Sequence, residues 1–253
     1  MNATPAWLDA LFPSGPPVFG EAVRMALDPQ PIHPDEAEQV AGAAGKRRVE
    51  FAAGRACARR ALSRLGIGHF VLKNGPDRAP RWPAGVVGSI SHAGAVPGGL
   101  CGVVVGRSRD FLTLGLDAEV ATAVGPDLWP RVTTESERGW LQAQPAEERL
   151  TLATVLFSAK ECFYKARYPL SGEFLEFADV EVALDPAGSS FEARLTAGGG
   201  ERQTSPILPE CKGRYVEVDG FVVTGIGVPT KDEIPTKLVV DEGKGGGRPR
   251  DRL

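Results

Sequence analysis

Cysteine, histidine and long apolar runs are all scarce in this chain of 253 residues. The four cysteines are scattered and form no Cys-x-x-Cys pair, which argues against a zinc site or a disulfide framework and favours buried thiols. No apolar run approaches the roughly 18 residues that a membrane-spanning helix needs. At the start of the chain no basic residue precedes an apolar stretch, so we expect no secretory signal and a cytoplasmic protein.

The overall composition is that of a globular protein. Hydrophobic residues make up 42% of the chain and charged residues 24%, enough to build a core. The length allows one large domain or two small ones. The net charge of -3 argues against a protein whose whole surface binds nucleic acid.

The predicted elements follow the order helices, strands, helices, strands. Helices are predicted from His33-Pro34 and over 45–65, 134–142 and 147–166, the last ended by Pro169 and Gly172. Strands are predicted over 86–91, 100–105, 111–117, 178–184, 191–195, 214–218 and 221–228. The repeated order predicts an α+β fold of two similar halves, 33–118 and 119–229. A proline-rich extended lead-in, 1–32, precedes them, and a glycine-rich flexible tail, 230–253, follows.

Two carboxylates end the third predicted strand. Asp117 and Glu119 stand two residues apart, so the alternation of a strand points both to the same face. Two such charges about 4 Å apart repel by about 4 kcal/mol at an effective dielectric near 20, so the pair favours a cation or a proton. Oxygen ligands of this kind suit Mg²⁺ or Mn²⁺. A solvated strand end is the simpler alternative.

The long helix carries the segment FSAKECFYK (157–165). Glu161 and Lys165 are four residues apart and could form an ordinary surface ion pair, worth roughly 0.3 to 0.5 kcal/mol. Three bulky aromatic residues of the same segment, Phe157, Phe163 and Tyr164, equally favour the wall of a site.

A basic cluster occupies the helix before the first strands. Seven basic residues and one acid lie between Lys46 and Arg64 in a chain that is acidic overall. Helical spacing places Arg48, Arg55 and Arg59 on one stripe, which is either a solvated face or a site for a polyanion. Basic residues of the loop that follows, Lys73, Arg78 and Arg81, could extend this patch.

The segment GSISH closes the first strand of the predicted sheet. Ser91 and His92 offer a hydroxyl and a ring N–H to phosphate oxygens. A Ser-His hydrolase is disfavoured, because neighbours on a strand point oppositely and no Gly-x-Ser-x-Gly elbow is present. Together with the carboxylates and the basic helix, these groups predict phosphoryl chemistry on a substrate with several phosphates.

Four ordered motifs resemble the phosphopantetheinyl transferase family, in particular the enzymes that act on carrier proteins of siderophore, non-ribosomal peptide and polyketide assembly. LGLDAE (114–119) and FSAKECFYK (157–165) are similar to that family's G-(I/V)-D-x-E and (F/W)-S-x-K-E-x-x-x-K signatures. KRRVEFAAGRACAR (46–59) and RWPAGVVGSISH (81–92) add two further matches, in the expected order. Leu116 departs from the usual valine or isoleucine.

The resemblance implies a pseudo-twofold monomer that binds coenzyme A in a cleft between its halves. Mg²⁺, or Mn²⁺, would be held by Asp117, Glu119 and Glu161. The phosphates of coenzyme A would be contacted by Arg47, Arg55, Lys73, Arg78, Ser91 and His92, with Lys160 and Lys165 facing the phosphate that is transferred. The helical stripe favours Arg48 and the motif register favours Arg47, so that assignment stays open.

The implied reaction moves the phosphopantetheine arm to a serine of an apo acyl or peptidyl carrier protein. Glu161, directly or through a metal-bound water, would take the serine proton, Lys165 would stabilise charge on the phosphate, and 3′,5′-ADP would leave. A metal-dependent nucleotide phosphohydrolase could use the same groups with water as the acceptor. A nucleic-acid module would use the basic helix alone, and its binding would survive the loss of Asp117.

Overall fold

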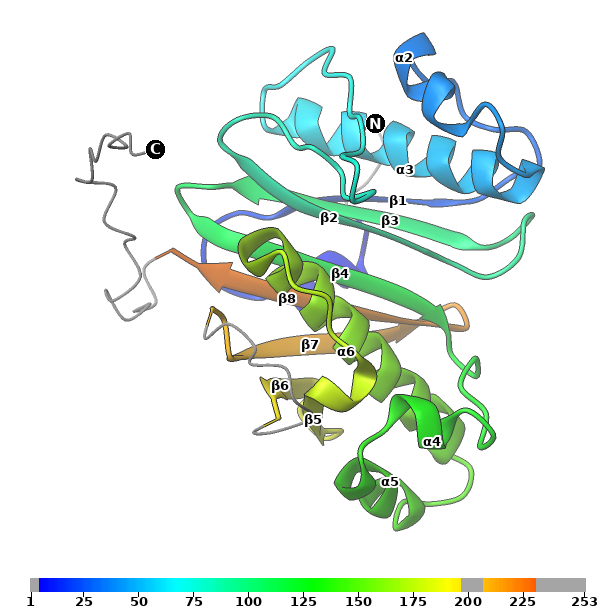
Figure 1. Cartoon of the computed structure of the whole chain (residues 1–253), viewed down its shortest axis with the longest axis vertical. Coiled ribbons are helices and arrows are strands. Elements are labelled where there is room, and N and C mark those ends of the chain that lie inside the picture. Colours follow the sequence, from blue (N-terminus) through cyan, green and yellow to red (C-terminus); the bar gives the residue numbers. More distant parts are fainter. Residues whose placement is uncertain (1–4, 197–206, 231–253) are drawn as a thin grey trace, which may run out of the picture.

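The computed structural model describes residues 5–196 and 207–230, whose strands form two antiparallel sheets (Figure 1). The first sheet has the order β1 (Phe19–Arg24), β3 (Leu100–Arg107), β2 (Val86–Ala93). The second has the order β4 (Phe111–Val120), β8 (Phe221–Pro229), β7 (Glu210–Val218), β6 (Ser190–Leu195), β5 (Val180–Asp185). Each sheet is covered by one long helix, so the prediction of an α+β fold with two similar halves is confirmed.

Helix α3 (Gly45–Arg64) packs on the first sheet, and the two together are called the first lobe. Its alanines, Cys57 and Leu62 are buried against Val103 and Val105 of β3, because small side chains let the helix lie close to the strands. Two short helical turns precede it, α2 (Pro34–Ala37) and η1 (Glu38–Val40). His33 caps α2 in a capping box with Glu36, which confirms the predicted helix start.

Helix α6 (Arg149–Ser171) lies across the second sheet, and these elements form the second lobe together with α4 (Trp129–Val132), α5 (Glu135–Gln142) and η2 (Phe177–Asp179) (Figure 1). The helix ends at Gly172, whose φ of +67° is a conformation that glycine adopts easily. It runs past the predicted end at 166. Pro169 sits in its last turn, where a missing N–H removes only one helical bond.

The lead-in and the boundary between the halves differ from prediction. Helix α1 (Trp7–Leu11) packs against β7 and β8, and β1 pairs with β3, so much of 5–32 belongs to the two lobes. Strand β4 pairs with β8 of the second sheet, which places the change of sheet between Arg107 and Phe111. The predicted boundary at 118 followed the end of that strand and could not show its pairing. Of the predicted tail, 230–253, residues 231–253 lie outside the described residues.

The two lobes meet where β2 lies beside β4. No backbone ladder joins these two strands in the part of the chain that the structure describes. Two serine hydroxyls of β2 link them instead. Ser89 Oγ accepts from Leu116 N at 3.1 Å, and Ser91 Oγ accepts from Ala118 N at 3.1 Å.

Two of the predicted absences can be compared with the structure. None of the described helices is long and apolar enough to cross a membrane. All four cysteines are free thiols, and Cys57, Cys101 and Cys162 are buried as expected, whereas Cys211 is half-buried.

Candidate active site

Asp117 of β4 forms the centre of the site and is almost completely buried. Its Oδ1 accepts hydrogen bonds from Lys165 Nζ at 2.6 Å and Ser91 Oγ at 2.9 Å. Its Oδ2 accepts from Ser158 Oγ at 2.8 Å. The carboxylate therefore ties β2 of the first lobe to α6 of the second, and one ammonium group balances its charge.

Gly115 explains why β4 and α6 come so close together. A Cβ added to this residue would overlap the carbonyl oxygen of Cys162 in α6, so a side chain here would push the helix off the strand. Ser158, Glu161 and Lys165 follow one another at spacings of three and four, which places them on the same face of α6. The glycine and the helical spacing together bring that face onto Asp117.

Glu119 and Glu161 complete an acidic cluster around Asp117. Burial, followed by the charges of Asp117 and Glu161, raises the pKa of Glu119 to about 7. Burial and the Asp117 charge also raise the pKa of Glu161. Burial alone would lower the pKa of Lys165, but Asp117 outweighs it and raises that pKa. Three carboxylates thus share one cation, and a protonated carboxyl group relieves part of their repulsion.

The donor set fits a hard divalent cation in its chemistry, because it consists of three mutually repelling carboxylates. Its arrangement does not match the expectation. Among the described residues, no group of three or more His, Cys, Asp or Glu side chains is placed to hold a metal ion. In this arrangement the oxygens of Asp117 are bound by Lys165 and two serines. A metal would share Asp117 with these groups or displace Lys165.

Arg55 is the most buried of the arginines predicted to bind phosphate. Its guanidinium stacks on Phe51, 3.9 Å from the ring centroid, and donates from Nη2 to Asn74 Oδ1 at 2.5 Å. Burial lowers its pKa to about 10 despite the nearby Glu36. Its Nε is shielded from solvent and has no hydrogen-bond partner among the residues that the structure describes. A buried donor without a partner is costly, and an anionic ligand would satisfy it.

Arg47 and His92 lie together at the end of β2. Arg47 Nη1 is 3.1 Å from His92 Nε2. A guanidinium can only donate, so Nε2 is the acceptor and the ring proton resides on Nδ1, 3.6 Å from Glu50 Oε1. Burial lowers the pKa of His92 and favours this neutral form. Arg48 instead lines a separate cavity beside Leu27 and Val96, so the structure places Arg47, and not Arg48, beside His92.

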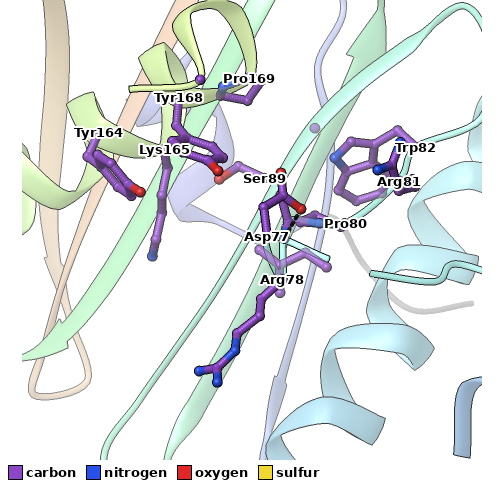
Figure 2. A pocket seen from close by; sticks show the side chains of 14 residues that line it. Asp77, Arg78, Pro80, Arg81, Trp82, Ser89, Tyr164, Lys165, Tyr168 and Pro169 are labelled. Atoms are coloured by element: carbon purple, nitrogen blue, oxygen red, sulfur yellow. Dashed lines mark hydrogen bonds between the residues drawn. The ribbon is translucent and has the colours of Figure 1, made fainter. Parts of the chain in front are cut away.

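Lys73 and Arg78 occupy the loop between α3 and β2. Lys73 forms an exposed ion pair with Asp35 at 3.1 Å, so the Asp35 carboxylate competes with a ligand for the Lys73 ammonium group. Arg78 lines a cavity of about 640 Å³ together with other residues of the loop segment 77–82 and with Tyr164, Lys165 and Tyr168 of α6. Figure 2 shows loop and helix on opposite sides of this cavity with Ser89 of β2 between them, and Arg78 extended away from Trp82.

A second cavity of about 440 Å³ lies in the second lobe, where Glu161 and Tyr164 form part of its wall. Its apolar lining comes from the segment after α6, including Leu175, Phe177 and Val180. Phe174, also in the lining, is 67% exposed and makes an edge contact with the ring of Tyr164. Tyr164 lines both cavities, and Glu161 stands at the boundary between the charged centre and the apolar space.

The structure corrects the placement predicted for Lys160. Its side chain is 2% exposed, forms an ion pair with Glu137 at 2.7 Å and donates to the carbonyl of Phe177 at 2.9 Å. Lys160 and Lys165 are five residues apart, which is about 140° around a helix axis. The two ammonium groups therefore point to different sides of α6, and only Lys165 reaches Asp117.

Three groups of the site were not predicted from the sequence. Ser158 binds Asp117, and its position three residues before Glu161 in the FSAKE segment was an available signal. Asn74 orients Arg55, and Glu137 pairs with Lys160. The last two come from distant segments whose contacts depend on the tertiary fold.

Comparison with known proteins yields matches along most of the chain. The model of the 4'-phosphopantetheinyl transferase N-terminal domain matches residues 35–106, and that of the 4'-phosphopantetheinyl transferase superfamily matches 113–207. The 4'-phosphopantetheinyl transferase Svp of Streptomyces mobaraensis is 39% identical over 221 residues, covering 86% of this chain and 85% of that protein. The 4'-phosphopantetheinyl transferase Npt of Nocardia iowensis is 32% identical over 201 residues, covering 77% and 88%.

A further match covers a shorter part of the chain. Enterobactin synthase component D of Salmonella typhimurium is 36% identical over 131 residues, about half of each chain. The fold, the site and these matches define a phosphoryl-transferring enzyme of two α+β lobes. The chain belongs to the 4'-phosphopantetheinyl transferase family and is an enzyme of that type.

Proposed function

We propose that this enzyme transfers the 4'-phosphopantetheine arm of coenzyme A to a serine hydroxyl of an apo acyl or peptidyl carrier protein and releases 3′,5′-ADP. One observation carries the proposal. The Asp117–Lys165 pair lies between cationic groups of the first lobe and the largely apolar cavity of the second, with Glu161 beside it. A diphosphate with a polyanionic nucleotide at one end and an uncharged arm at the other fits this sequence of environments.

The first lobe suits the nucleotide end of coenzyme A. Arg47 and His92 lie together, and Arg55 has a buried donor without a partner. These groups would bind the nucleotide phosphates, with Lys73 and Arg78 at the edge of the same surface. Ser91, whose hydroxyl proton is donated to Asp117, would hold that carboxylate in place near the diphosphate.

The second lobe suits the pantetheine arm. The cavity beside Glu161 has an apolar lining and a volume of about 440 Å³. An arm bound there would extend from the diphosphate at Lys165 past Tyr164, which lines this cavity as well as the larger one between the loop 77–82 and α6. This placement leaves the first lobe free for the nucleotide.

The residues of α6 supply the chemistry of the transfer. Glu161, which lies beside the Asp117–Lys165 pair and has a pKa raised by burial and by Asp117, would accept the serine proton as the oxygen attacks phosphorus and the bond from phosphorus to 3′,5′-ADP breaks. Lys165 would stabilise the charge that develops on the phosphate oxygens. Asp117, Glu119 and Glu161 would hold Mg²⁺ or Mn²⁺, and such an ion supplies charge neutralisation at the diphosphate.

Mass spectrometry of an apo carrier protein incubated with coenzyme A and Mg²⁺ tests the function. A mass gain of one phosphopantetheine arm supports it. Cleavage of coenzyme A without modification of the carrier would instead support a metal-dependent phosphohydrolase. Glu161→Gln should abolish transfer while coenzyme A binding stays measurable, and the exposed Glu135→Gln provides a matched control on α5.

The proposal also covers the oligomeric state of the enzyme and its place in the cell. One chain supplies both the cations and the carboxylates of the site, so we infer a monomer acting in the cytoplasm, where coenzyme A and apo carrier proteins meet. Light scattering at the assay concentration measures the oligomeric state. A second subunit required for activity would contradict the monomer.

A further inference from the structure

A buried ion pair holds the side of α6 that faces away from Asp117. Lys160 Nζ and Glu137 Oε2 are 2.7 Å apart, and each side chain is 2% exposed. Lys160 immediately precedes Glu161, yet the two side chains lie on different sides of the helix. The pair is thus attached to the same turn as the proposed base but takes no part in the cluster around Asp117.

The pair is bound to three other elements. Glu137 Oε2 accepts from Thr134 N at 2.6 Å at the start of α5, and Glu137 Oε1 accepts from Val182 N of β5 at 2.7 Å. Lys160 Nζ donates to the carbonyl of Phe177 in η2 at 2.9 Å. The two charges therefore connect one turn of α6 to α5, β5 and η2 by directional bonds.

Stability alone is a poor explanation for such a pair. Moving two charges out of water is expensive, and apolar residues of similar volume in the same place are often as stable. Packed apolar side chains tolerate small rotations and shifts of a helix, whereas short hydrogen bonds to three backbone groups tolerate few. What the pair adds is a defined rotation of α6 about its axis.

We propose that Glu137 and Lys160 are positioning residues, which fix the rotation of α6 and so direct Glu161 toward the acceptor hydroxyl. This inference rests on the proposed function, in which Glu161 is the base. A turn of about 100° separates neighbouring residues on a helix, so a modest rotation moves the carboxylate away from the reacting atoms. The Lys160 side chain also forms part of the wall of the second cavity, but its ammonium group is bound to Glu137 and to the Phe177 carbonyl, so neither positioning residue is assigned a polar contact with coenzyme A.

The experiment uses the full-length enzyme with the double variant Glu137→Gln/Lys160→Met. It removes both charges without leaving one of them buried and unpaired, and the glutamine keeps an acceptor oxygen for a backbone N–H. We expect kcat to fall about 10- to 100-fold while KM for coenzyme A stays within about 3-fold. The single variant Lys160→Arg keeps the charge and a hydrogen-bond donor, so its kcat should be higher than that of the double variant.

A matched control removes a similar ion pair on the surface. Lys212 and Glu192 lie 2.8 Å apart on neighbouring strands and are well exposed. Glu192→Gln/Lys212→Met should leave both kcat and KM within about 2-fold of the wild type. If the first double variant does not fold, Glu137→Asp keeps both charges and should lower kcat, and not raise KM, through the shortened reach.

Two results would overturn the positioning role. The first is a kcat within about 2-fold of wild type in the folded double variant. The second is a KM for coenzyme A that rises at least 10-fold in Lys160→Met but not in Glu137→Asp, because Lys160 would then contact the substrate phosphate. A wild-type enzyme that fails to modify any apo carrier would refute the proposed function, and is measured first.

Discussion

Helix α6 carries two lysine–carboxylate pairs of nearly equal length and opposite character. Lys165 and Asp117 lie 2.6 Å apart on the side that faces β4, and Lys160 and Glu137 lie 2.7 Å apart on the side that faces α5. The first pair is flanked by two further carboxyl groups, Glu119 and Glu161, whose pKa values are raised by burial and by the charge of Asp117. The second is closed by backbone N–H and carbonyl groups. Equal geometry therefore does not imply equal function: surplus charge marks the reactive pair.

The largest effect is expected from breaking the pair beside the acidic cluster. Lys165→Met removes the only ammonium bound to Asp117 among the described residues, and we expect kcat/KM for carrier modification to fall by about 10²- to 10³-fold. Steady-state transfer measures it. A loss smaller than 10-fold would place Lys165 outside the reacting centre and would erase the contrast with Lys160.

The next effect tests how closely the reactive side of α6 must approach β4. Gly115→Ala places a methyl group against the Cys162 carbonyl, and we expect a loss of about 2 to 4 kcal/mol in the free energy of unfolding. Gly139→Ala in α5, where the added methyl group meets open space, is the control and should be neutral or stabilising. Denaturant titration compares the two. Equal stabilities would mean that the strand and the helix can separate at little cost.

A similar contrast between neighbouring residues exists on α3. Arg47 contacts His92, whereas Arg48 lines a different cavity. We expect Arg47→Ala to raise KM for coenzyme A about 10-fold through the loss of a charged phosphate contact, and Arg48→Ala to change it less than 2-fold. Initial rates over a range of coenzyme A concentrations distinguish them. The reverse order would favour the stripe of Arg48, Arg55 and Arg59.

The smallest effect concerns the surplus charge itself. The pKa of Glu119 in the folded protein, about 7, lies above its ordinary value of 4.5, so its contribution to stability is present at low pH and is lost as the pH rises through 7. Glu119→Gln should match the wild type at pH 4. At pH 8 it should be more stable by roughly 1 to 2 kcal/mol, since solvent reduces the repulsion at a half-buried site.

Thermal unfolding at the two pH values checks this prediction for Glu119. Mg²⁺ at pH 8 should raise Tm more in the wild type than in the variant, because a bound cation offsets the same repulsion. A variant that is less stable than the wild type at pH 8 would show that the charge of Glu119 does not destabilise the folded protein.

Much of this contrast could be predicted from the sequence. Strand alternation placed Asp117 and Glu119 together, and helical spacing placed Glu161 and Lys165 on one face. The same spacing also contained the correction for Lys160, which falls on another side of the helix. The motif resemblance had assigned both lysines to the phosphate, and the geometry of the helix separates them.

The remaining parts depend on contacts between distant segments. Strand β1 was missed because its pairing with β3 joins residues far apart in the chain, and Pro16 and Pro17 before it favoured an extended loop. No local sequence signal indicates that Arg55 binds Asn74 or that Lys160 pairs with Glu137. The boundary at 118 failed for the same reason, since only the pairing of β4 with β8 shows which sheet it joins.

The serine link between β2 and β4 has a mechanical consequence. Within each sheet the strands are joined by backbone hydrogen bonds. Between β2 and β4 the backbone N–H groups of Leu116 and Ala118 instead donate to the single hydroxyls of Ser89 and Ser91. Each such bond is worth only about 1 kcal/mol. The described strands of the two lobes are therefore held together by these hydroxyls and by a shared apolar core, which includes Val104 of β3, Leu116 of β4 and Val223 of β8, and not by a backbone ladder.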